Sequence, residues 1–213
     1  MRTVASSAYE LQRRCRGAAI IAGIVAIMGI ITSEVTYPSY STAKNDISDL
    51  GATRPPSSII KQPAATIFGV TLVISGLLLI GGAFCTYRAF GNSRSSGLLA
   101  LFLGLFGVGA IGAALFNGSN DASLVAHTLF ALLTFSAGAI AAIVAYFVER
   151  SPFRYISVVL GLVALAGLVL VILYGDANPI FSAIGNGGAE RWIVYPSVLW
   201  VIGFGGYLMG PPL

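Results

Sequence analysis

The sequence predicts an all-α protein, a bundle of six transmembrane helices that crosses a membrane repeatedly. Of the 213 residues, 56% are hydrophobic and 9% are charged, whereas soluble domains carry about 25% charged residues. The charged residues leave six long runs without Asp, Glu, Lys or Arg. A helix needs about 20 mostly apolar residues to cross the hydrocarbon core. The connections between these runs are too short to form a separate soluble domain.

The runs define the expected elements in order, within a single domain of residues 1–213. We interpret the first as an uncleaved span, because it is longer than the apolar core of a typical signal peptide and no clear cleavage site precedes Glu34. Small residues at helical spacing, such as Ala137, Ala141 and Ala145, favour close helix packing in lipid. The last run ends at a proline pair. The expected spans are about 17–33, 63–87, 97–116, 123–148, 155–174 and 191–210.

The basic residues predict that the N- and C-termini are both cytoplasmic. With this orientation, eight of the 12 Lys and Arg residues lie in inner segments and four lie in outer segments. Cytoplasmic loops are enriched in Lys and Arg, so this distribution indicates topology. The positive net charge therefore implies no nucleic-acid partner. We expect a multi-pass protein of the cell membrane.

The sequence predicts no metal site and no cofactor. Cys15 and Cys85 are expected near the inner ends of their helices, in a reducing compartment, where a structural disulfide is not expected. Two isolated thiols do not make a metal site. The single histidine, His127, cannot build the usual zinc site alone.

The first outer connection, residues 34–61, is too long and too patterned for a simple linker. Asp46 and Asp49 are three residues apart, so a helical turn would bring both carboxylates to one side. Gly51 and the Pro55-Pro56 pair then break that turn. Ionisable residues close to a membrane are functional candidates by default, and the acidic ones are concentrated on the expected outer face.

His127 lies between one and two turns into the fourth run. A histidine exchanges protons near neutral pH when a carboxylate orients it, which makes His127 a candidate general base. Asp49 and Asp121 are the candidate carboxylates. The alternative is that His127 is a hydrogen-bonded packing residue with no catalytic role.

Glu190 and Arg191 are expected to open the sixth helix. A glutamate is favoured at a helix N-terminus, whereas an arginine there opposes the helix dipole and needs a nearby anion. A structural ion pair that ties the outer loops together and a phosphate held by the guanidinium are both compatible with this requirement. Tyr195, one turn further, extends the same polar group. The expected anions are Asp46, Asp49, Asp121 or the phosphate of an outer-leaflet lipid.

Three segments carry a family resemblance: NDISDLGATRPPSSIIKQPAATIFG, the pattern Asn120-Asp121-x5-His127, and GNGGAERWIVYP. Together they resemble an archaeal and bacterial integral-membrane family known as domain of unknown function 998. The first segment is also similar to a motif of a eukaryotic six-span group, the damage-regulated autophagy modulators and GPI-anchor lipid-remodelling proteins. That group has an acidic residue where this chain has Ser57-Ser58.

The resemblance implies a six-span fold and directs attention to the outer segments, and the closer family has no assigned activity. The second group implies a link to lipid remodelling. The residues that the resemblance indicates are Ser48, Asp49, Gly51, Pro55, His127, Glu190, Arg191, Tyr195 and Pro196.

Two hypotheses follow. In the first, an outer-face pocket binds or remodels lipid head groups, with membrane lipids as partners and with His127, Asp49 and Asp121 as catalytic residues if a reaction occurs. In the second, the chain is a non-catalytic scaffold or accessory subunit with protein partners in the membrane. Transport is disfavoured, because no ionisable residue lies near the bilayer midplane. The residues expected to bind the ligand are Asp46, Ser48, Glu190, Arg191 and Tyr195.

Overall fold

Six long helices and one short 3-10 helix make up the part of the chain that the structure describes. The computed structural model describes residues 2–91, 93–175 and 179–209. The six long helices are sufficiently long and apolar to cross a membrane, so the chain is the predicted all-α, multi-pass membrane protein. The elements are α1 (Arg2–Thr36), η1 (Ser48–Leu50), α2 (Ala64–Ala89), α3 (Arg94–Leu115), α4 (Asp121–Ala145), α5 (Phe153–Tyr174) and α6 (Pro179–Met209).

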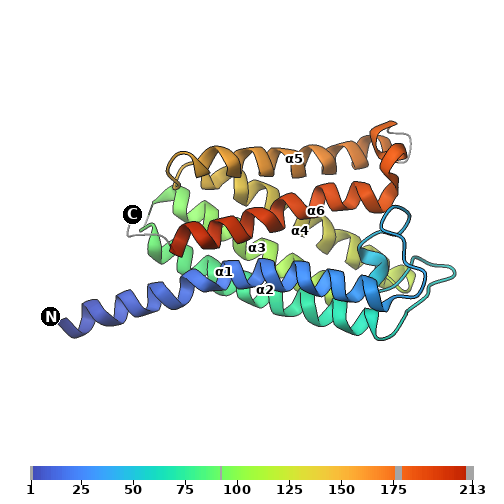
Figure 1. Ribbon diagram of the computed structural model, residues 1–213, viewed down its shortest axis with the longest axis horizontal. Coiled ribbons are helices and arrows are strands. Elements are labelled where there is room, and N and C mark those ends of the chain that lie inside the picture. Colours follow the sequence, from blue (N-terminus) through green and yellow to red (C-terminus); the bar gives the residue numbers. More distant parts are fainter. Residues whose placement is uncertain (1, 92, 176–178, 210–213) are drawn as a thin grey trace.

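The six long helices lie side by side along one axis of the bundle (Figure 1), and their contacts close into a ring. Each helix packs along the next one in the chain, α6 packs against α1, and α4 also touches α6 across the ring. Helix α1 begins and α6 ends at the same end of the bundle, which we call the terminal end. Helix η1 lies at the opposite end, which we call the η1 end.

Small residues bring neighbouring helices close together. A Cβ atom on Gly76 of α2 would lie 2.6 Å from the backbone oxygen of Gly107 on α3, so these two helices meet almost backbone to backbone. The predicted alanine stripe of α4, Ala137, Ala141 and Ala145, is buried. Close approach of this kind replaces the hydrophobic driving force that helices lack in lipid.

The first connection folds over the η1 end of the bundle as a cap. Leu50 is 0% exposed and Ile47 is 4% exposed, and both pack against Tyr37 and against Phe68 of α2. Gly51 follows η1, where its backbone N–H donates to Ser48. Ile47, between the two aspartates, and Leu50, directly after the second one, therefore anchor the loop. The polar side chains are held at fixed positions above the helices.

Helix α6 begins earlier than its charge pattern predicts. It starts at Pro179 and contains one non-helical residue, Gly185, with φ 75° and ψ 168°. The expected start at residue 191 therefore falls inside the helix, and Pro196 is an interior proline. The expected end at residue 210 lies outside the described residues. The charged pair at 190 and 191 concealed the earlier start, because it resembles the beginning of a helix.

Cys85 differs from expectation, since it is disulfide-bonded. The prediction of an isolated thiol used only the compartment in which the residue was expected to lie. Disulfide formation also depends on how close two cysteines come, and the sequence does not contain that distance.

Candidate functional site

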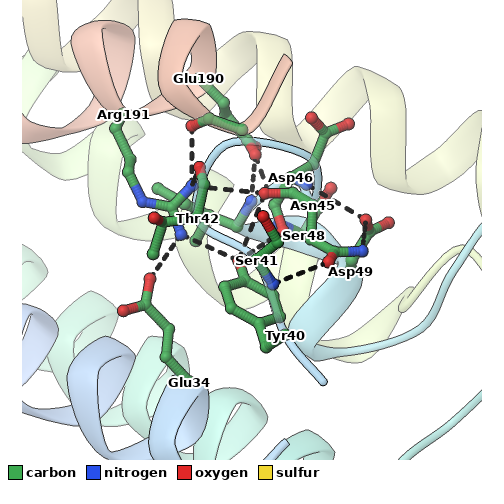
Figure 2. A network of polar contacts seen from close by, with 12 residues as sticks. Glu34, Tyr40, Ser41, Thr42, Asn45, Asp46, Ser48, Asp49, Glu190 and Arg191 are labelled. Carbon is green, nitrogen blue, oxygen red and sulfur yellow. Dashed lines mark hydrogen bonds and ion pairs between the residues drawn. The ribbon is translucent and has the colours of Figure 1, made fainter. Parts of the chain in front are cut away.

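Arg191 is the centre of a polar network that joins α1, the first connection and α6 (Figure 2). Its Nη2 donates to Glu34 Oε1 at 2.5 Å and to the Tyr40 hydroxyl at 2.9 Å. Its Nη1 donates to the backbone oxygens of Gly187 at 2.7 Å and Thr42 at 2.9 Å. The side chains of Arg191 and Glu34 are 11% and 16% exposed. The guanidinium is therefore engaged by the protein itself.

The Tyr40 hydroxyl connects Arg191 to the backbone of the first connection. It donates to the backbone oxygen of Asp46 at 2.8 Å while it accepts from Arg191. Burial raises the pKa of Tyr40, so the hydroxyl keeps its proton at neutral pH. The Tyr195 ring packs against the same apolar cluster as Tyr40. Both tyrosines thus bridge the polar network and the apolar underside of the cap.

Glu190 holds the start of η1. Its Oε2 accepts hydrogen bonds from the backbone N–H groups of Ile47 and Ser48, the second at 3.4 Å. These N–H groups lie at the beginning of η1, where helical backbone donors lack partners of their own. Glu190 and Arg191 therefore fasten the loop from two sides, through adjacent residues of one helix.

The anion that Arg191 requires is Glu34, in the last turn of α1. The expected partners were acidic residues of the loops or a lipid phosphate. In the sequence, Glu34 directly follows the first uncharged run, where it marks the end of a span. It was identifiable, since it is the only acidic residue at the expected outer end of that span.

Asp46 and Asp49 are close in the loop, but their carboxylates have different partners. Asp49 Oδ2 accepts from the Asn45 side chain and from the backbone N–H of Asp46, both at 3.1 Å. Asp46 Oδ2 instead pairs with Arg54 at 3.0 Å. Asp49 thus stabilises the turn that leads into η1, whereas Asp46 points to the next part of the loop.

His127 is oriented by backbone carbonyls. Its Nδ1 lies 2.7 Å from the Phe116 oxygen and 3.1 Å from the Ala113 oxygen, at the end of α3. Because carbonyl oxygens only accept, Nδ1 must carry a proton. In the neutral ring, Nε2 then presents a lone pair. The geometry therefore provides a hydrogen-bond acceptor or a base at Nε2.

Asp121 begins α4 and has a helix-terminal role. It is exposed in the first turn, where a carboxylate is favoured by the helix dipole. The neighbouring Asn120 caps the helix through a 2.9 Å bond from the Ser123 backbone N–H. Asp49 lies in the cap and Asp121 at a helix terminus, so they and His127 are held by three separate sets of local contacts.

A groove of about 730 Å³ opens beside the cap, between α4, α5 and α6. Its polar lining comes from the η1 end and includes Asp46, Ser48, Arg54, Asn117, His127, Asn186 and Glu190. Its apolar lining includes Leu132, Phe135, Leu168, Val171, Ile172 and Ile193.

A second, smaller cavity of about 80 Å³ lies in the centre of the ring, and its lining is mainly apolar. The two cavities share the side chains of Ser48, His127, Ala131, Phe135 and Glu190. These residues form the junction between the polar mouth of the groove and the apolar interior of the bundle.

The comparison with family models identifies the relatives of this chain. A model of a family described as proteins of unknown function, DUF998, matches residues 20–207. The chain belongs to the DUF998 family. The match extends from α1 to α6 and includes the cap, the Arg191 network and the residues at the cavity junction. Neither a curated protein nor a solved structure matches the chain.

In this DUF998 protein, the predicted site residues fall into distinct groups. Asp46, Ser48, His127 and Glu190 line the groove. Arg191 binds the cap, with Tyr195 one turn further along α6. Sequence reasoning missed the groove residues Arg54, Asn117 and Asn186 and the network residues Glu34 and Tyr40. A signal was available for these five, because all are polar and lie in or next to the expected outer segments.

The DUF998 chain also has a buried polar cluster at the terminal end, which sequence reasoning missed entirely. Glu149 is 4% exposed, and its Oε2 accepts from the Ser157 hydroxyl at 2.6 Å. Trp200 Nε1 donates to Ser157 at 3.2 Å. Among the described residues, the other carboxylate oxygen of Glu149 has no hydrogen-bond partner. Burial raises the pKa of Glu149 to about 7.

Proposed function

We propose that this DUF998 protein binds a membrane lipid, with the polar head at the mouth of the groove and the chain against its apolar wall. The observation that supports this proposal is the distribution of polarity along one cavity. A volume of about 730 Å³ lies within the roughly 300–1,000 Å³ that is usual for small-molecule sites. A polar mouth joined to an apolar wall matches an amphipathic molecule.

The position of the groove supports a lipid over a water-soluble ligand. The groove lies between three helices that are sufficiently apolar to cross a membrane. Leu129 and Leu173, which follow groove residues on α4 and α5 but do not line the groove, are 63% and 66% exposed, as expected for a surface covered by lipid tails. A lipid could therefore enter sideways from the bilayer. The proposal places the protein in the cell membrane with the groove on the outer side.

Native mass spectrometry of the purified protein tests lipid binding. Ala131 lies at the cavity junction, so Ala131→Phe fills the site. Ala166 is exposed on α5, and Ala166→Phe adds the same ring to the outer surface. We expect lipid adducts for the wild type and for Ala166→Phe, and at least a fivefold loss for Ala131→Phe. Equal adducts in all three proteins would contradict a site in this groove.

Lipid remodelling is the catalytic form of the same proposal. His127 Nε2 would act as the general base at the cavity junction, because its Nδ1 is committed to backbone carbonyls. Incubation with candidate lipids, followed by mass spectrometry of the lipids, tests it. A new product that His127→Gln abolishes supports catalysis, whereas unchanged lipids indicate binding alone.

A second candidate, a scaffold or accessory subunit, is supported by the Arg191 network. The guanidinium donates to five groups in three parts of the chain, so its role in holding the cap is independent of any ligand. This candidate predicts that the groove-filling Ala131→Phe leaves cellular function intact. It also predicts co-purification of a membrane protein from the native host, and loss of that protein when Arg191→Ala loosens the cap.

A further inference from the structure

Three hydroxyl groups around the cavities have already used their protons. Thr128 donates to the Leu124 oxygen at 2.9 Å, and Thr134 donates to the Phe130 oxygen at 2.7 Å, both within α4. Ser75 of α2 donates to the Ala22 oxygen of the neighbouring helix α1 at 3.2 Å. A hydroxyl that donates to a carbonyl presents only its oxygen lone pairs to a ligand. These three groups therefore act as acceptors.

His127 adds an acceptor at the junction of the two cavities. The two carbonyl oxygens at the end of α3 fix the proton on Nδ1. The remaining ring nitrogen, Nε2, carries a lone pair in the neutral ring. The side chain lines both cavities, together with Glu190, whose carboxylate is also an acceptor. The position where head and chain of a lipid meet is thus rich in acceptors.

The charges of the groove disfavour a negatively charged head group. Asp46 and Glu190 both contribute carboxylates to the lining. Arg54 is the only Lys or Arg among the described lining residues, and it is already paired with Asp46 at 3.0 Å. Arg191 is not in the lining, and its guanidinium holds the cap. An anion in the groove would face two acidic side chains and a single basic one, Arg54, which is already paired with Asp46.

We infer that the lipid bound in this groove has a head group that bears hydrogen-bond donors and no negative charge, such as a hydroxyl-bearing or an amine head group. This inference rests on the proposed lipid-binding function and specifies its ligand class. It differs from the sequence-based expectation of a phosphate at Arg191. The donors of the head group meet Glu190 and His127 Nε2, and a positive charge, where present, is stabilised by the two carboxylates.

Competition among lipids with the same chain tests this inference. The wild-type protein is stripped of lipid and incubated with three probes: monooleoylglycerol, oleylamine and oleoyl lysophosphatidic acid. Native mass spectrometry then measures the occupancy of each. We expect monooleoylglycerol and oleylamine to exceed lysophosphatidic acid at least tenfold. The probes share an 18-carbon chain, so the ratio reports the head group.

Two variants test whether residues that line the groove cause the head-group preference. His127→Leu removes the acceptor at the junction and is expected to lower monooleoylglycerol occupancy at least fivefold. Asp46→Asn removes one carboxylate and is expected to raise the relative occupancy of lysophosphatidic acid at least threefold. A melting temperature for each variant shows whether it is folded. Asp46→Asn predicts a gain of binding, which loss of folding cannot imitate.

The outcomes separate this inference from the function on which it rests. Equal or greater occupancy by lysophosphatidic acid overturns the head-group class and leaves lipid binding standing. If both variants are folded and bind the three probes in the same ratios as the wild type, His127 and Asp46 do not determine the head-group preference. Absence of all three probes from the wild type, with no native lipid adduct, overturns the proposed function as well.

Discussion

Arg191 shows how much of a site a single residue can reveal. Its place beside Glu190 near the start of a helix predicted an anionic partner, and the structure contains one, Glu34. The identity of that partner depends on the packing of α6 against α1, which joins residues 157 positions apart. The charge of Arg191 near a helix start therefore predicted an anionic partner. Only the tertiary structure identifies this partner as Glu34.

Removing the Arg191 guanidinium is expected to loosen the cap. Arg191→Ala leaves the Glu34 carboxylate and several loop carbonyls without their donor, and loss of one partner of a buried ion pair costs about 3–5 kcal/mol. We expect a lower melting temperature in detergent and faster proteolysis of the loop between α1 and α2.

Arg191→Lys serves as the matched control, because it keeps the charge but loses the planar fork of donors. An intermediate melting temperature is expected. If Arg191→Ala melts like the wild type, the network does not hold the cap.

Glu149 predicts a pH dependence of stability. Burial raises its pKa from 4.5 to about 7 in the folded protein. The folded state thus binds the proton more tightly than the unfolded chain. Protonation of Glu149 therefore adds to the free energy of unfolding, in full below pH 4.5, and this contribution is lost as the pH rises to about 7. At about 1.4 kcal/mol per pH unit, the loss is about 3 kcal/mol.

Melting temperatures between pH 4.5 and 8 measure this effect. Glu149→Gln should reduce the fall in melting temperature, because the amide does not titrate. Asp121→Asn removes an exposed carboxylate and should retain the decline. A decline of the same size in Glu149→Gln would assign the effect to another group.

At the scale of elements, local composition predicted the helices and tertiary contacts determined their ends. Uncharged runs are sufficient to predict spans, because lipid leaves a helix as the only way to satisfy every backbone group of a single segment. The irregular residue Gly185 of α6 lies directly against the cap. A Cβ on Gly185 would meet the Ala43 backbone oxygen, and that proximity cannot be read from the order of residues.

Gly187 provides a test of the contact between α6 and the cap. A Cβ there would collide with the backbone oxygens of Thr42 and Asn45. Overpacking of this kind costs about 1–3 kcal/mol, so Gly187→Ala should lower the melting temperature. Gly206 lies on the same helix with open space around it. Gly206→Ala should leave the melting temperature unchanged or slightly higher, and an equal loss in both variants would contradict the contact.

At the scale of the whole molecule, the charge distribution predicts an orientation. Both the start of α1 and the end of α6 lie at the terminal end, which the basic residues predict to be cytoplasmic. In a bacterial host, green fluorescent protein fused to the C-terminus should fluoresce, and alkaline phosphatase fused at the same point should be inactive. The opposite pair of results would place the groove on the inner side.

The groove was only partly predictable. The sequence showed that polar residues gather at one end of the bundle, and four of the predicted residues line the cavity: Asp46, Ser48, His127 and Glu190. It did not show that Arg191 is committed elsewhere, or that α4, α5 and α6 leave a space beside the cap. A cavity results from the relative placement of several helices, and no single segment encodes it.

Photo-crosslinking with a monooleoylglycerol that carries a diazirine in its chain examines the proposed lipid site itself. Peptide mass spectrometry should find labels on groove residues such as Phe135, Leu168 and Ile193, and excess unlabelled monooleoylglycerol should suppress them. Labels only on the outer surface, at residues such as Leu129 and Val159, with no suppression by the competitor, would contradict lipid binding in the groove.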